Sequence, residues 1–153
     1  QGEVGMGEVR LEIKQSIDLT ISDPNNPSWK EEDKIFFDSL HNALKLYKEY
    51  VPKEMRVSVF NDDTEDRGYQ IQRTEPGGFY NWHEDQLNNR KLTYIWYLND
   101  VVEDGYTEFI TGKRVQPKRG RMMIFPALWP WVHRGYPPKS EIKYICTGWT
   151  TSN

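Results

Sequence analysis

The feature that most limits the fold of this chain is the change of sequence pattern at Pro52. Beyond it the sequence consists of short runs rich in aromatic and β-branched residues, which are typical of strands. These runs cover residues 56–60, 69–73, 79–82, 92–98, 106–111, 121–125, 131–133 and 142–150. Turn-forming residues such as Pro76-Gly77-Gly78 separate them. Short strands joined by turns predict a β-sandwich or a jelly roll as the main body.

The part before Pro52 predicts one strand-like segment and one helix. Residues 9–21 alternate apolar and polar side chains, with a phase change near Gln15. Ser28 and Glu31 have the spacing of a capping box, so we expect a helix to begin there. Apolar residues then recur at helical spacing, at Phe36, Leu40, Ala43, Leu44, Tyr47 and Val51. We therefore predict a mainly β protein with one flanking helix over residues 28–51.

Length and composition exclude several classes of protein. We expect 153 residues to form a single domain over residues 1–153, with its motif-bearing core at about residues 55–150. The one cysteine, Cys146, allows no internal disulfide and no cysteine-based zinc site, which favours a reducing compartment. Because 20 Lys and Arg face 23 Asp and Glu, the net charge is −3, and we expect no nucleic-acid partner.

No apolar run is long enough for a membrane-spanning helix, and the first ten residues lack the basic and apolar regions of a signal peptide. We therefore expect a cytoplasmic protein without a membrane partner, although a chain that starts at Gln1 is either processed or a fragment. A monomer is the default expectation.

The chemistry of this chain is concentrated in two of its three histidines. In a strand, residues two apart point to the same face, so His83 and Asp85 can meet one ion while Glu84 points away. His133, from a later strand, can supply a third ligand. Two histidines and one carboxylate with open positions form the facial triad of non-haem Fe(II) oxygenases. The alternative is that each histidine is a structural imidazole and Asp85 a turn acid. We assign His41, on the predicted helix, a structural role.

The segment PGGFYNWHED at residues 76–85 resembles the prolyl 4-hydroxylase-like branch of the 2-oxoglutarate/Fe(II)-dependent dioxygenases. Later motifs of that family also have counterparts here, in the same order and spacing. They are residues 94–99 (YIWYLN), residues 105–109 (GYTEF), and the V-x-P, G and F-P positions within residues 115–126. The resemblance covers about residues 55–150. It implies a double-stranded β-helix, which is a jelly-roll barrel, with helices packed on one side.

The resemblance also implies the co-substrate site. Lys143 lies ten residues after His133, where the family places a Lys or Arg. On the predicted strand it shares one face with Ile145, Thr147 and Trp149, so we expect it to point into the barrel and pair the far carboxylate of 2-oxoglutarate. Tyr97 matches a co-substrate tyrosine of the family, although a core role is nearly as plausible. A further expected tyrosine is Thr74 here, which leaves a larger pocket.

The implied function is hydroxylation of a peptidyl or protein proline. Such an enzyme uses Fe(II), 2-oxoglutarate and O₂, with ascorbate as a candidate reductant, and releases succinate and CO₂. Trp131, Arg134 and Trp149 are candidate substrate residues beside the proposed ligands, and aromatic residues there can equally be core. Two alternatives remain open: hydroxylation of a free amino acid or other small molecule, and a non-catalytic jelly-roll binding module.

Overall fold

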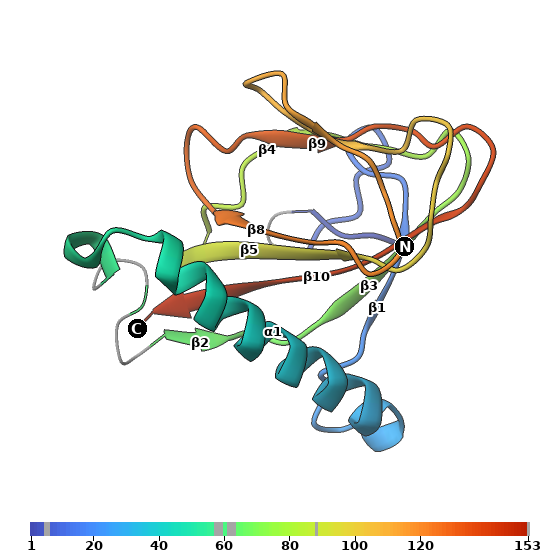
Figure 1. Cartoon of the computed structure of the whole chain (residues 1–153). Helices are drawn as coiled ribbons and strands as arrows, with labels where there is room; N and C mark the ends of the chain where they lie inside the picture. Colours follow the sequence, from blue (N-terminus) through green and yellow to red (C-terminus); the bar gives the residue numbers. More distant parts are fainter. Residues whose placement is uncertain (5–6, 57–59, 61–63, 88, 153) are drawn as a thin grey trace.

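A computed structural model describes residues 1–4, 7–56, 60, 64–87 and 89–152. Two antiparallel sheets face each other, and a single long helix lies on the outside of the larger one (Figure 1). The larger sheet contains β1 (Ile17–Thr20), β3 (Gln70–Thr74), β10 (Lys143–Ser152), β5 (Arg90–Tyr97) and β8 (Met122–Pro126), in that order, with β2 (Thr64–Asp66) paired to β10. The smaller sheet contains β4 (Tyr80–His83), β9 (His133–Gly135), β6 (Thr107–Phe109) and β7 (Arg114–Val115). This architecture confirms the predicted jelly roll with a flanking helix.

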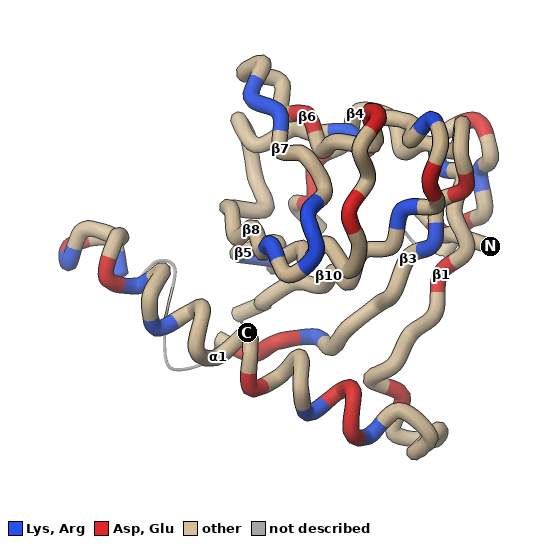
Figure 2. The backbone as a smooth tube through the Cα atoms, turned by 45° about the vertical axis from the view of Figure 1, so that its right-hand side comes forward, with Lys and Arg blue, Asp and Glu red and all other residues tan. Residues whose placement is uncertain are grey.

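The helix covers the larger sheet through the apolar face that the sequence predicted. Helix α1 (Lys30–Tyr50) follows a 3-10 turn, η1 (Pro27–Trp29), and a second such turn, η2 (Lys53–Met55), comes after it. Leu40 is fully buried in a cluster with Tyr69, Tyr94 and Trp96 of the sheet. Acidic and basic residues are interspersed along α1 (Figure 2), which suits its solvent-facing side.

The predicted cap of this helix was wrong. Trp29 occupies the N-cap of α1 and makes no side-chain capping bond. The side chain of Asn26 instead accepts a hydrogen bond from the Ser28 amide, one turn earlier. The reason is Pro27, whose fixed φ starts the 3-10 turn before the α-helix and places Ser28 inside that turn.

The predicted strands from residue 69 onward fall on β3, β4, β5, β6, β8, β9 and β10, with ends shifted by a few residues. The run at residues 56–60 lies mostly outside the described residues. The short strands β2 and β7 were not predicted. Of residues 9–21, only Ile17–Thr20 form a strand, and residues 11–13 form a turn.

The phase change at Gln15 has a structural cause. Lys14 pairs with Tyr80 of the smaller sheet, whereas β1, which begins two residues after Gln15, pairs with β3 of the larger sheet. The chain therefore crosses from one sheet to the other at Gln15, and the alternation restarts. Among the described residues, no helix has both the length and the hydropathy needed to cross a membrane.

The space between the sheets holds an apolar cluster and, beside it, a partly polar cavity. Ile95, Phe109 and Phe125 form a buried cluster between the sheets. On β10, Cys146 joins the cluster under the helix, whereas Lys143 and Thr147 point into the barrel interior. This alternation leaves a partly polar cavity beside the apolar cluster.

Candidate metal centre

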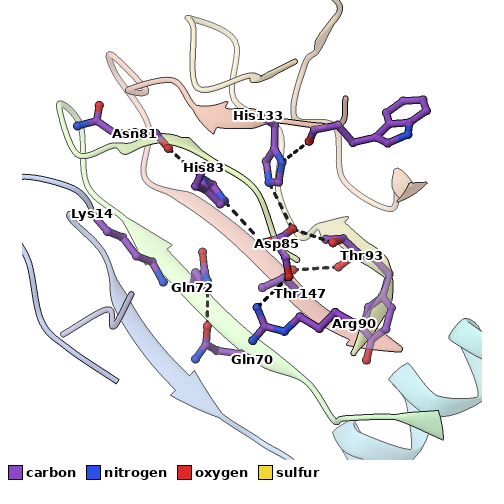
Figure 3. A network of polar contacts seen from close by, with 12 residues as sticks. Lys14, Gln70, Gln72, Asn81, His83, Asp85, Arg90, Thr93, His133 and Thr147 are labelled. Carbon is purple, nitrogen blue, oxygen red and sulfur yellow. Dashed lines mark hydrogen bonds and ion pairs between the residues drawn. The ribbon is translucent and has the colours of Figure 1, made fainter. Parts of the chain in front are cut away.

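His83 and His133 face each other across the pairing of β4 with β9, where they are direct Cα partners. Asp85 lies two residues beyond His83, in the segment after β4 has ended. Its carboxylate oxygens lie 3.8 Å from His83 Nε2 and 3.6 Å from His133 Nε2 (Figure 3). The three candidate ligand atoms all lie within 4.8 Å of one another. The structure thus brings the predicted triad together, although Asp85 is not on a strand as expected.

Both imidazoles are oriented by backbone carbonyls in the same way. His83 Nδ1 lies 2.7 Å from the carbonyl oxygen of Asn81, and His133 Nδ1 lies 3.0 Å from that of Trp131. Each carbonyl comes from the residue two positions earlier in the chain. An Nδ1–H that donates to such a carbonyl leaves the Nε2 lone pair for a metal ion. Both Nε2 atoms face the Asp85 carboxylate.

The electrostatics of the centre suit a divalent cation. Burial, together with the charge of His133, lowers the pKa of His83 to about 3, so this imidazole is neutral at pH 7. Burial raises the pKa of Asp85, but His133, His83 and a hydrogen bond from Thr93 outweigh burial and hold that pKa below its ordinary value. A carboxylate with imidazole donors and no thiolate is the ligand set of non-haem iron. The residues present therefore fit Fe(II).

The triad opens into the cavity between the sheets. Lys143, Ile145, Thr147 and Trp149 of β10 all line this cavity, as their predicted common face requires. Thr147 Oγ1 donates to the carbonyl of Tyr94 at 2.9 Å, which leaves its lone pairs available to a ligand.

Lys143 is a buried cation with no anionic partner among the described residues. Its side chain is 5% exposed, and its Nζ donates to the carbonyl oxygen of Gly105 at 3.1 Å. Burial lowers the pKa of Lys143 to about 8. Thr74 pairs with Lys143 across β3 and β10 and also lines the cavity. An ammonium in this position requires an anion to offset its loss of hydration.

Three of the proposed site residues do not line the cavity. Tyr97 is fully buried, and its hydroxyl donates to Thr107 Oγ1 at 2.7 Å, so that it reaches the cavity only through Thr107. Trp131 precedes β9, and its indole packs on Phe109 and Phe125, the two rings that also lie against His133. Arg134 follows His133 directly, so alternation turns it outward to an ion pair with Glu108.

Several residues in or beside the cavity were not among the predicted site residues. The ring of Tyr80 stacks on His83 with centroids 3.6 Å apart, because a register irregularity between the two residues brings them to one side. Thr93 Oγ1 donates to the Asp85 carboxylate at 2.7 Å. Lys14 also lines the cavity, and the guanidinium of Arg90 lies 3.6 Å from the ring of Trp149. The phase change at Gln15 indicates that Lys14 lies outside the larger sheet. For Thr93, a single threonine in a strand, the sequence pattern gives no comparable indication.

Residues 69–151 match the sequence profile of a family described as the 2OG-Fe(II) oxygenase superfamily. No curated protein gives a significant match to the chain.

Solved structures share the fold. A viral collagen prolyl hydroxylase from Paramecium bursaria Chlorella virus-1, in complex with 2-oxoglutarate, has a TM-score of 0.69 at 20% identity over 92% of this chain and 81% of its own. A prolyl-4-hydroxylase from Pseudomonas putida has a TM-score of 0.68 at 21% identity over 94% of this chain and 73% of its own. A Trichoplax adhaerens prolyl hydroxylase, in complex with a hypoxia-inducible-factor peptide, has a TM-score of 0.67 at 17% identity over 99% of this chain and 69% of its own.

Proposed function

Since the chain belongs to the 2OG-Fe(II) oxygenase superfamily, we propose that His83, Asp85 and His133 hold its Fe(II) and that its substrate is a prolyl residue. Membership makes the protein a dioxygenase that uses Fe(II), 2-oxoglutarate and O₂. The observation that carries the proposal is one cavity with two features: three ligand atoms within 4.8 Å of one another, and the buried cation of Lys143. The first suits the metal and the second suits the dicarboxylate.

Each group in the cavity has a distinct task. When bound, Fe(II) would supply the oxidative chemistry that turns 2-oxoglutarate and O₂ into succinate and CO₂, with one oxygen atom of O₂ entering a C–H bond of the substrate. Lys143 binds the far carboxylate of 2-oxoglutarate, and Thr147, which shares its face, contributes hydroxyl lone pairs to the same site. Tyr97 acts through Thr107 at the edge of this site. The two sheets exclude water and fix the orientation of the co-substrate.

The aromatic wall of the cavity supports a prolyl substrate. Trp149 lines the cavity, and its indole Nε1 is buried without a hydrogen-bond partner among the described residues. Arg90 lies over the ring of Trp149, and the ring of Tyr80 lines the cavity beside His83. A buried N–H donor without a partner, on a ring that lines the cavity, suits a peptide carbonyl next to an apolar ring. The similarity to prolyl hydroxylases in fold is consistent with this substrate.

Replacing Trp149 with Phe is expected to raise KM for a proline-containing peptide about tenfold, because a ring remains but the N–H donor is lost. KM for 2-oxoglutarate is expected to stay within about twofold. Steady-state kinetics with each substrate varied in turn measures both constants. The matched control is Trp29→Phe at the start of the helix, remote from the cavity. An unchanged KM for peptide in the Trp149 variant would remove this residue from the substrate site.

A second candidate substrate is a small anionic molecule such as a free amino acid. Lys14 is 3% exposed and lines the same cavity, where it is paired with Asp18. Asp18 and the Glu3 carbonyl take two of the three Lys14 donors, and the third suits a substrate that carries its own carboxylate. Mass spectrometry after incubation with proline-rich peptides and with a panel of free amino acids distinguishes the two. A gain of 16 Da only in peptides supports the first substrate, and a gain only in free amino acids supports the second.

A further inference from the structure

The structure fixes the orientation of the two proposed histidine ligands differently from that of the proposed aspartate ligand. His83 and His133 lie on paired strands, and a backbone carbonyl fixes each ring. Asp85 lies beyond the end of β4, so no strand pairing fixes its backbone. The direction of its carboxylate must therefore come from side-chain contacts.

Thr93 supplies the contact that orients this carboxylate. It lies on β5, the strand between β10 and β8, and its side chain is 1% exposed. Its Oγ1 donates to Asp85 Oδ2 at 2.7 Å (Figure 3). Among the described residues, Thr93 is the only side chain that donates a hydrogen bond to this carboxylate. The same oxygen, Oδ2, lies 3.6 Å from His133 Nε2, and the other, Oδ1, lies 3.8 Å from His83 Nε2.

We propose that Thr93 is a positioning residue that holds Asp85 in its metal-binding orientation. The hydroxyl engages one carboxylate oxygen and restricts rotation of the group, so that the carboxylate stays directed toward the two imidazoles. A central strand is a rigid place for such a donor, because Thr93 is paired with Trp149 on one side and Phe125 on the other. Partners that orient metal ligands typically change metal affinity by about 10–100-fold when removed. This inference rests on the proposed triad.

The test compares Thr93→Val, which keeps the shape of the side chain and removes the hydroxyl, with Thr93→Ser, which keeps the hydroxyl. The probe is Mn²⁺, whose free concentration is followed by electron paramagnetic resonance without co-substrate. Thr93→Val is expected to raise the Kd for Mn²⁺ about 10–100-fold, and Thr93→Ser is expected to stay within about threefold of the wild type. Retention of affinity by the serine variant separates positioning from packing.

The matched control is Thr150→Val. Thr150 is equally buried, lies on β10 and accepts a hydrogen bond from the Leu92 amide at 3.2 Å, but does not line the cavity. Its loss is expected to lower the melting temperature and to leave the Kd for Mn²⁺ unchanged. If Thr93→Val does not fold, Thr93→Ala is used instead, and metal affinity is measured as the rise in melting temperature with Mn²⁺.

The outcomes separate this inference from the proposed function. If the wild type binds no Mn²⁺, or if His133→Ala binds it equally well, the triad itself is wrong. If the wild type binds Mn²⁺ through the triad and Thr93→Val binds it with the same Kd, only the role of Thr93 is overturned. Equal losses in the valine and serine variants would show that packing, and not the hydroxyl, matters at this position.

Discussion

Replacing His133 with alanine is expected to reduce Fe(II)-dependent release of succinate from 2-oxoglutarate by at least about 1,000-fold, or about 4 kcal/mol in the activation barrier. The reason is that His133 lies opposite His83 and 3.6 Å from Asp85, so its loss leaves two donors where the centre requires three. Succinate is measured with and without added Fe(II). Bound iron, measured on the same preparations, is expected to fall in parallel.

The control for this prediction is His41→Ala. His41 is exposed on α1, and within the described part of the chain its ring interacts with Phe37 of the same helix. This variant is expected to keep the activity of the wild type. Circular dichroism of all the proteins without metal verifies that the fold is retained. Iron-dependent turnover that survives in folded His133→Ala would place the metal elsewhere in the chain.

Replacing Lys143 with alanine is expected to raise KM for 2-oxoglutarate about 100-fold, because removing one partner of a buried ion pair typically costs 2–5 kcal/mol, and 100-fold is about 2.7 kcal/mol. Metal affinity is expected to stay near that of the wild type, since Nζ bonds to the Gly105 carbonyl and not to the triad. Kinetics at saturating Fe(II) measures KM, and Mn²⁺ binding measures the metal site. The control is Lys139→Ala, a mostly exposed lysine paired with Asp104.

The pH dependence of 2-oxoglutarate binding follows from the pKa of Lys143, which burial lowers to about 8. Below pH 8 the ammonium is charged and binds the dicarboxylate. Above pH 8 it loses its proton, so kcat/KM for 2-oxoglutarate is expected to fall about tenfold per pH unit. Lys143→Arg keeps its charge over this range and is expected to flatten the profile. A wild-type profile that is level from pH 7 to pH 9.5 would exclude Lys143 as the anchor.

The triad was predicted from the two-residue spacing of His83 and Asp85 and a distant histidine, taken together with the family resemblance of the surrounding motifs. The two-residue spacing of His83 and Asp85 allows both to reach one ion, and a later strand supplies His133. The common face of Lys143 and Thr147 follows from strand alternation alone, which holds because β10 is long and paired on both sides.

The contacts that the sequence did not predict occur where strand alternation is interrupted. Trp131 precedes β9, and its indole packs on Phe109 and Phe125 instead of lining the cavity. Tyr80 and His83 stack despite an odd spacing, because the register shifts between them. Thr93 and Asp85 are eight residues apart, on either side of the segment that leads into β5. Such contacts depend on loop geometry, which propensity and periodicity do not specify.

The crossing of the chain from one sheet to the other at Gln15 determines how long a fragment must be to preserve the cavity. The family match starts at residue 69, yet the bonds from Asn81 to Ile13 and from Gln15 to Phe79 hold the opening segment against β4, while β1 continues the larger sheet. A fragment cut to the matched residues would keep all three proposed ligands. It would lose the segment around Gln15, which joins the two sheets beside the cavity. It would also lose helix α1. The smallest fragment that preserves the cavity is thus longer at its amino end than the family profile suggests.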